Sequence, residues 1–276
     1  MDYLEIVLDV SGIGLDVQDM MIAQLNDSGF DSFEQKQNVI HAFTRNTKLS
    51  IDEFLKLSNS LSFSFNIIDF KILEDKNWND VWESDFNPVL INNCYIRAPF
   101  HDVIKNIKYD ILISPNMSFG TGHHETTYLM ISNLLQINCV NKNVLDVGSG
   151  TGVLSILSEK KGASNIYSLD IDSYAYRNTL DNIKLNNCHN ISTYNSDIYG
   201  LSSNQKFDIL LANINKNILI SQLSQYISVM SQDAIIMISG FFDSDFESIH
   251  LLALKYKLTL KHDVTKNKWK CAVYLK

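Results

Sequence analysis

The stretch VLDVGSGTGVLSI, residues 144–156, decides the fold of this chain. An apolar strand that carries Asp146 near its end runs into a turn with Gly148, Gly150 and Gly152, and an apolar helix follows. Glycines suit such a turn because the chain reverses sharply and must let a ligand approach its backbone closely. The pattern therefore predicts a nucleotide-type binding turn at the edge of a parallel α/β sheet.

The spacing of these glycines separates the possible ligands. A dinucleotide fingerprint requires a glycine at position 153, which is Val153, and a phosphate-binding P-loop would end in lysine followed by serine or threonine. Asp146 would repel a pyrophosphate but attract the amino group of a methionine moiety, directly or through water. The turn therefore predicts S-adenosylmethionine as the cofactor and argues against a nicotinamide-dependent oxidoreductase.

A second set of acids follows the next two predicted strands. Asp170 ends one strand, where a carboxylate reaches the ribose hydroxyls of an adenosine group. Asp172 is predicted to cap the following helix. Asp197 lies where this fold often contacts adenine, but a solvated loop acid is an equally good interpretation.

Strands and helices alternate from residue 128 onward, which predicts a mostly parallel sheet with helices on both faces. The predicted strands are Asn143–Val147, Asn165–Asp170, a short one near Ile191, Phe207–Asn213, Ala234–Ser239, and two closing strands near Leu258 and Ala272. The predicted helices are Tyr128–Leu135, one from about Thr151, Ser173–Asn186, one from about Asn217, and one before the closing strands. Residues 116–276 are thus predicted to form a Rossmann-like domain that binds S-adenosylmethionine.

The first 74 residues have a different order of predicted strands and helices. Strands are predicted at 3–10, 30–34, 39–43 and 62–73, with helices at 17–27 and 51–57. This β-α-β-β-α-β order is that of a ferredoxin-like α+β domain. Because it holds no glycine-rich loop, we interpret it as a substrate-recognition or scaffolding module, and a purely structural role is equally open.

Residues 75–115 are predicted to be a connector that packs on the catalytic domain. This segment combines acids with Trp78, Trp82 and Phe86, and it contains all three prolines of the chain. Aromatic residues at such spacing are more typical of packing than of a ligand cage.

The composition limits the kinds of binding partner and the cellular location that we expect for this chain. A net charge of −8 argues against direct nucleic-acid binding by a basic face and suits a basic partner. The acidic N-terminus is unlike a secretory signal, and no apolar run reaches the roughly 18 to 20 residues of a membrane span. The four cysteines have neither metal-site nor paired spacing. We expect a soluble, cytoplasmic monomer with free thiols.

Four strings of the sequence resemble one family. FGTGHHETT (119–127), LLANIN (210–215), WNDVWESDFNP (78–88) and KWKCAVYL (268–275) are similar to the PrmA family, the methyltransferases of ribosomal protein L-eleven. The similarity runs in order from about residue 71 to the C-terminus. In one departure, His123 and Glu125 stand where the family loop often has threonine and proline, so the loop is expected to be more mobile.

This resemblance implies the site residues and the substrate. Thr127, Gly148, Asp170 and Asn213 would contact S-adenosylmethionine, and Asn213 would also bind the acceptor amine. Many amino-methylating enzymes carry an Asn-Pro-Pro-aromatic motif at that strand end, although Asn213 could instead cap the next helix. The implied substrate is ribosomal protein L-eleven of the large subunit, methylated at lysines and at its N-terminal amine.

Other interpretations stay open at this point. The His-His-Glu run lacks the spacing of a metal site on a helix, so no metal is predicted. A methyltransferase of the same fold acting on RNA or on a small molecule is the nearest alternative, and a non-catalytic adenosine-binding adaptor is another. The acceptor amine must be neutral to react, and the sequence offers no dedicated base.

Overall fold

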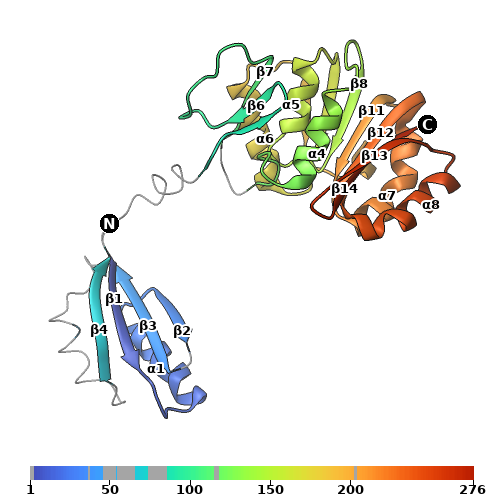
Figure 1. Cartoon of the computed structure of the whole chain (residues 1–276). Helices are drawn as coiled ribbons and strands as arrows, with labels where there is room; N and C mark the ends of the chain where they lie inside the picture. Colours follow the sequence, from blue (N-terminus) through green and yellow to red (C-terminus); the bar gives the residue numbers. More distant parts are fainter. Residues whose placement is uncertain are drawn as a thin grey trace. The chain divides into compact units, whose positions relative to one another are not determined.

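The computed structural model describes residues 3–36, 38–45, 54, 66–73, 86–114, 118–201 and 204–276. The chain divides into two compact units, Met1–Asp85 and Phe86–Lys276 (Figure 1).

The first unit contains an antiparallel sheet with the strand order β2-β3-β1-β4 in its described part. Its elements are β1 (Tyr3–Asp9), α1 (Leu15–Asp27), β2 (Ser32–Lys36), β3 (Val39–Arg45) and β4 (Asn66–Leu73). Alternate residues of β1 point to opposite faces, so Leu4, Ile6 and Leu8 share a fully buried core with Met21 and Leu25 of α1. The predicted helix at 51–57 lies outside the described residues except for one position, Phe54, which is helical and buried in this core.

The second unit is built on a sheet with the strand order β10-β9-β8-β11-β12-β14-β13. The strands are β8 (Asn143–Val147), β9 (Asn165–Leu169), β10 (Ile191–Tyr194), β11 (Phe207–Asn213), β12 (Met230–Phe242), β13 (Thr259–Lys266) and β14 (Trp269–Leu275). Strands β10, β9, β8, β11 and β12 pair in parallel, whereas β14 runs antiparallel to both β12 and β13. This confirms the predicted mostly parallel Rossmann-like sheet.

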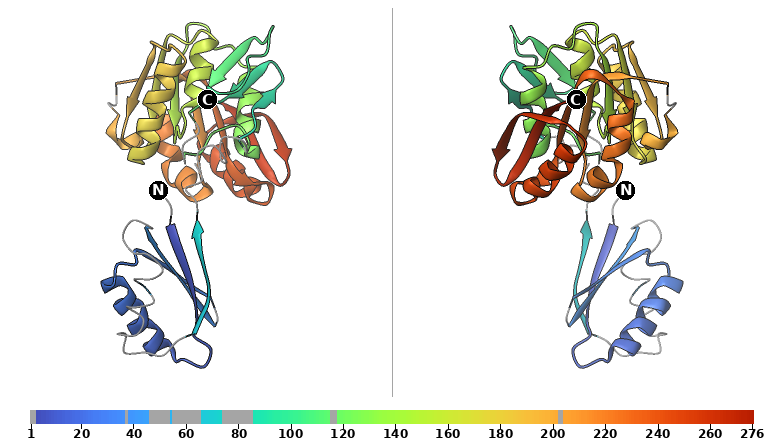
Figure 2. Two further views of the ribbon diagram at one scale, coloured as in Figure 1. Left: turned by 90° about the vertical axis from the view of Figure 1, so that its left-hand side faces the viewer. Right: turned by 90° about the vertical axis from the view of Figure 1, so that its right-hand side faces the viewer.

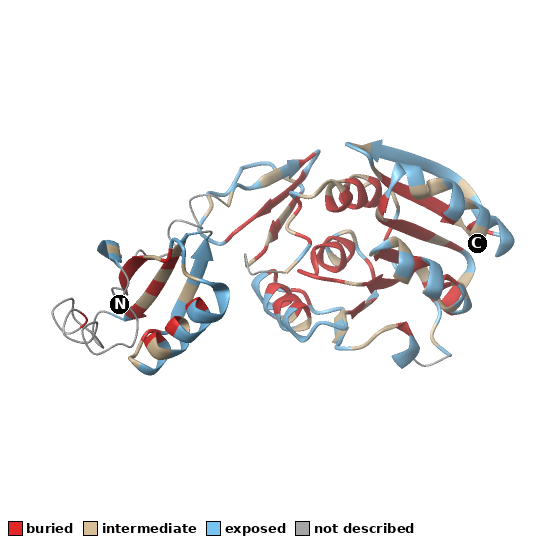
Figure 3. Cartoon of the chain, turned by 90° about the horizontal axis from the view of Figure 1, so that it is seen from below, coloured by how far each residue is buried: buried red, intermediate tan, exposed pale blue. Residues whose placement is uncertain are grey.

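Helices cover both faces of this sheet (Figure 2). They are α4 (Glu125–Leu134), α5 (Val153–Lys160), α6 (Ser173–Leu185), α7 (Lys216–Val229) and α8 (Phe246–Lys255), with short 3₁₀ turns η1 (Ile198–Gly200) and η2 (Asp243–Asp245). Alternate residues of a strand point to opposite faces of the sheet and join different hydrophobic cores. Leu211 packs with α4 and α5, whereas Leu210 packs with α7 and α8. Figure 3 shows the buried strands and the exposed outer sides of the helices. Burial on both faces explains why these strands read as continuous apolar runs.

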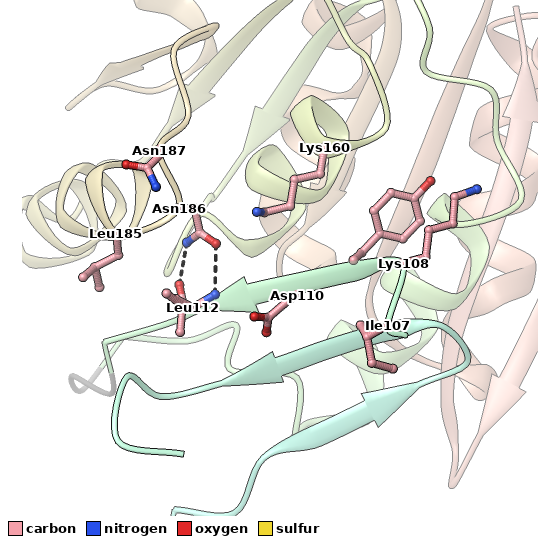
Figure 4. A pocket seen from close by; sticks show the side chains of 9 residues that line it. Ile107, Lys108, Asp110, Leu112, Lys160, Leu185, Asn186 and Asn187 are labelled. Carbon is pink, nitrogen blue, oxygen red and sulfur yellow. Dashed lines mark hydrogen bonds between the residues drawn. The ribbon is translucent and has the colours of Figure 1, made fainter. Parts of the chain in front are cut away.

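A small sheet, which the sequence did not predict, precedes the strands of the seven-stranded sheet. It consists of β5 (Val89–Ile91), β6 (Cys94–Arg97) and β7 (Tyr109–Leu112), in the order β5-β6-β7. The Asn186 side chain bonds to both backbone groups of Leu112, accepting its N–H at 2.9 Å and donating to its carbonyl at 2.6 Å (Figure 4). A groove of about 390 Å³ lies beside this contact. The described part of the predicted connector is therefore folded against α6.

Some element boundaries differ from the prediction because of local turns. Helix α4 begins three residues before Tyr128, since Nδ1 of His124 accepts the N–H of Thr126 at 3.2 Å and caps it. Strand β2 begins at Ser32 rather than Phe30, because the Phe30 N–H still bonds to the Leu25 carbonyl in the turn that ends α1. Strand β12 extends beyond both predicted ends.

Among the described residues, no helix is both long enough and apolar enough to cross a membrane.

Candidate active site

The predicted site residues meet at the carboxyl ends of β8, β9 and β11. Val147 of β8 lies opposite Leu169 of β9 and Ala212 of β11. The glycine turn, Asp170 and Asn213 follow directly or end these strands, so they gather at one edge of the sheet. Ligands of open α/β sheets bind at this edge.

The glycine turn has a left-handed backbone at its three glycines, with φ values of 71°, 57° and 78° for Gly148, Gly150 and Gly152. A Cβ atom at Gly148 would lie 2.5 Å from Cγ2 of Ile214, and one at Gly150 would overlap the carbonyl oxygen of Phe119. Other parts of the chain, namely Ile214 and Phe119, therefore approach the backbone of this turn closely. Both the conformation and the contacts restrict these positions to glycine.

Asp170 fastens the turn to the end of β9. Its Oδ2 accepts the N–H of Gly150 at 2.9 Å, and its Oδ1 accepts the N–H of Asp172 at 3.0 Å. Asp172 in turn accepts the N–H of Tyr174 at 2.8 Å, which confirms its predicted capping of α6. Ile171 and Tyr174 are 71% and 75% exposed, so two large side chains lie open beside the half-buried carboxylate.

Asp197 follows β10 and caps a short turn. Its Oδ1 accepts the N–H of Tyr199 at 3.0 Å, at the start of η1.

Asp146 lies beneath the glycine turn and is only 1% exposed. Its Oδ2 accepts a hydrogen bond from Oγ of Ser155 at 2.7 Å, whereas its Oδ1 has no partner among the described residues. Burial raises the pKa of Asp146 to about 7, the charge of Asp170 acts in the same direction, and the Ser155 hydrogen bond opposes both. A buried carboxylate oxygen of this kind is a site where a cationic group or a water molecule would be stabilised.

This pKa predicts a pH dependence of cofactor affinity. Below about pH 7 Asp146 is protonated and must lose its proton before it can stabilise a cationic amino group. Calorimetric affinity for S-adenosylhomocysteine should therefore rise between pH 6 and pH 7.5. Asp146→Asn, which can still accept the Ser155 hydrogen bond, should show a flat profile over this window. If the affinity of wild type and of Asp146→Asn changed equally with pH, Asp146 would not be the group that binds the amino group of the cofactor.

Buried polar residues of α6 hydrogen-bond to the glycine turn, and the sequence pattern alone did not reveal them. Oγ1 of Thr179 donates to the Gly150 carbonyl at 2.9 Å, and Nδ2 of Asn182 donates to the Thr151 carbonyl at 2.8 Å. Asn182 also accepts the N–H of Ser114 at 2.7 Å. The signal was present as polar residues at helical spacing, but that spacing is equally typical of an exposed face.

The structure brings Thr127 and Asn213, two of the predicted cofactor-binding residues, into contact. Nδ2 of Asn213 donates to Oγ1 of Thr127 at 3.4 Å, and Oδ1 of Asn213 is buried with no partner among the described residues. The capping interpretation of Asn213 is wrong, because Asn215 caps α7 by accepting the N–H of Ile218 at 3.1 Å. The Asn213 amide is thus oriented by Thr127, and its oxygen is left without a hydrogen-bond donor among the described residues.

A pocket of about 250 Å³ opens beside Asn213. Its walls include Phe119, His124 and Trp269. The His124 ring lies 5.0 Å from that of Phe119 and 4.7 Å from that of Trp269, and Phe242 packs on Trp269 at 4.2 Å. Nothing in the sequence indicates that these rings meet, because they come from segments far apart in the chain.

The two histidines of the loop point to different partners. His124 caps α4, and Nε2 of His123 lies 2.8 Å from the carbonyl oxygen of Asn87. Among the described residues there is no cluster of three or more histidine, cysteine or acidic side chains that could hold a metal.

The strand order, with β14 inserted antiparallel between β12 and β13, and the glycine turn followed by an acid after β9 define the catalytic domain of a class I methyltransferase. A family model described as "Ribosomal protein L11 methyltransferase (PrmA)" matches residues 3–276. The chain belongs to the PrmA family.

Similar proteins support this assignment. The ribosomal protein L11 methyltransferase of Bacteroides fragilis is 37% identical over 98% of each chain. That of Phocaeicola vulgatus is 36% identical over 100% of this chain and 99% of its own. A solved structure of the ribosomal protein L11 methylase of Lactobacillus delbrueckii subsp. bulgaricus has a TM-score of 0.63 and 22% identity, and it covers 68% of this chain and 98% of that one. This structural match concerns the fold alone.

Proposed function

We propose that this protein transfers methyl groups from S-adenosylmethionine to amino groups of ribosomal protein L11, at lysine side chains and at the N-terminal amine. The observation that carries the proposal is the buried Oδ1 of Asn213, which has no partner in the described part of the chain and lies beside a pocket with aromatic walls. An acceptor amine offers the N–H donors that this oxygen lacks. Membership of the PrmA family and the curated relatives support the choice of substrate.

The residues at the sheet edge fit the cofactor. Asp170 would hold the ribose hydroxyls, and the exposed side chains of Ile171 and Tyr174 would pack on the adenine. The Oδ1 of Asp146 and the backbone of the glycine turn would face the methionine part, where the amino group is cationic. When bound, S-adenosylmethionine supplies a sulfonium methyl whose leaving group is a neutral thioether, so no acid is required.

The acceptor amine must reach the methyl group in its neutral form. A lysine amine has a pKa near 10.4 in water, and an apolar environment lowers it by disfavouring the charged form. The rings of Phe119, His124 and Trp269 provide such an environment. His124 serves as a helix cap rather than as the base, because its Nδ1 accepts the backbone N–H of Thr126 at the start of α4. Catalysis therefore rests mainly on desolvation and positioning.

The same rings suit a substrate that is methylated more than once. A methylated ammonium group is attracted to aromatic faces by about 0.5 to 2 kcal/mol. The surplus of 31 acidic over 23 basic residues favours approach of a basic ribosomal protein.

The experiment is methyl transfer from radiolabelled S-adenosylmethionine into separated ribosomal proteins, ribosomal RNA and the small-molecule fraction. We expect label in one large-subunit protein, lost in Asp170→Ala and retained in Asp181→Ala, an exposed acid of α6. Label in RNA or in small molecules, or none in any fraction while cofactor still binds, would contradict the proposal.

A further inference from the structure

The loop Ser118–His124 shapes the pocket, and its sequence contains two glycines and no proline. Gly120 and Gly122 have φ values of 108° and 93°, and no proline lies between residue 115 and the end of the chain. Phe119 and His124 of this loop both line the pocket beside Asn213. The position of the loop therefore sets the shape of the proposed acceptor site.

The inner side of the loop is bound to the glycine turn through one residue. The backbone N–H of Thr151 donates to the Phe119 carbonyl at 2.9 Å, and its Oγ1 donates to the Gly120 carbonyl at 2.7 Å. These two bonds restrain Phe119 and Gly120. The rest of the loop, which leads into α4, is held by other contacts.

His123 holds the outer side of the loop to the first residues of the second unit. Its Nε2 donates to the carbonyl oxygen of Asn87 at 2.8 Å, and its Nδ1 is 3.0 Å from Oγ1 of Thr121. Its ring also meets that of Phe86 edge-on at 5.0 Å. One side chain thus joins the loop to a segment 36 residues earlier.

Glu125 holds the next turn of the chain to the β13–β14 hairpin. It is the first residue of α4, and its Oε1 accepts a hydrogen bond from Nδ2 of Asn267 at 3.1 Å. Asn267 lies in the tight turn that leads into Trp269, where its φ is 48°. This bond therefore links the end of the loop to the strand that carries another wall of the pocket.

We propose that His123 and Glu125 are a pair of positioning residues that brace the loop Ser118–His124 over the cofactor and acceptor sites. The inference rests on the proposed function for its kinetic consequence, but the brace itself is a property of the loop. Loss of both hydrogen bonds is expected to change the equilibrium between the braced and the released loop by about tenfold.

The test compares His123→Ala/Glu125→Ala with His123→Gln/Glu125→Gln. Glutamine can donate to the Asn87 carbonyl at position 123 and can accept from Asn267 at position 125. His189→Ala, which removes an exposed histidine in the loop between α6 and β10, is the control for loss of an imidazole. The readouts are the rate of chymotrypsin cleavage after Phe119, which is 51% exposed, the calorimetric affinity for S-adenosylhomocysteine, and kcat and KM.

The double alanine variant should be cut after Phe119 about ten times faster than wild type and should bind S-adenosylhomocysteine about tenfold more weakly. The KM for S-adenosylmethionine should rise by more than kcat falls. The glutamine pair and His189→Ala should stay within about threefold of wild type in all three readouts.

Two results would overturn the brace. One is a folded double alanine variant, with the near-ultraviolet circular dichroism of the wild type, whose cleavage rate and affinity are unchanged. The other is a glutamine pair as impaired as the alanine pair. Because cleavage and affinity require no methyl transfer, a wild-type protein that fails to methylate L11 would refute the proposed function alone.

Discussion

Replacing Asn213 with alanine is expected to lower kcat for methyl transfer by about two to three orders of magnitude, the effect of removing one preorganised polar group from a catalytic site. The amide oxygen is buried beside the pocket and is oriented by the hydrogen bond to Thr127. Without it, the acceptor amine would enter the pocket with an N–H group unpaired and its lone pair unaligned. Steady-state kinetics at saturating S-adenosylmethionine measures this change.

Asn215→Ala is the comparison that separates catalysis from helix capping. Asn215 caps α7, so its loss should lower the free energy of unfolding by about 1 kcal/mol. Asn213→Ala should leave the thermal midpoint near that of wild type. If Asn213→Ala lowered stability as Asn215→Ala does while kcat stayed unchanged, Asn213 would be a structural residue.

Replacing Gly150 with alanine is expected to abolish tight cofactor binding, with a loss in affinity of about a hundredfold or more. The added Cβ atom would overlap the Phe119 carbonyl oxygen, and the residue would be held at a φ of 57°. Either the glycine turn or the loop must then move, and the Gly150 N–H contact with Asp170 would be displaced. Calorimetry with S-adenosylhomocysteine measures the loss.

Gly162→Ala is the matched control for backbone strain. Gly162 also has a left-handed φ, 92°, but the nearest atom to an added Cβ is a Val140 methyl at 3.4 Å. Strain alone should therefore cost this variant about 1 kcal/mol of stability and leave cofactor affinity unchanged. Equal loss of affinity in both variants would mean that strain, and not the contact with Phe119, is responsible.

The catalytic sheet could be predicted because its strands are buried on both faces. The strands Asn143–Val147 and Phe207–Asn213 have the predicted bounds, since continuous apolar runs between polar turns leave little ambiguity. The register of parallel strands then places the residue after each strand at one edge. For this reason the glycine turn, Asp170 and Asn213 could be grouped from the sequence before their contacts were seen.

The remainder depends on contacts between distant segments. Strands β5 to β7 are three or four residues long, too short for a periodic signal, and β7 is held by Asn186, 74 residues away from Leu112. The raised pKa of Asp146 arises from burial, which a sequence pattern does not measure. The aromatic walls of the pocket likewise combine the loop before α4 with the last hairpin.

The contacts that restrain the loop Ser118–His124 could not be predicted from the sequence either. The absence of proline led to the expectation of a more mobile loop, since only the lost restraint is visible in the sequence. The partners of His123 and Glu125 lie 36 and 142 residues away, so the restraints they provide appear only in the folded chain.

The mass of purified ribosomal protein L11 after incubation with this enzyme and S-adenosylmethionine tests the proposed activity most directly. We predict an increase by whole methyl groups, located by fragmentation at lysine side chains and at the N-terminal amine, and no increase with Asn213→Ala. An L11 mass that stays unchanged with wild-type enzyme shown to bind the cofactor would contradict the proposed activity.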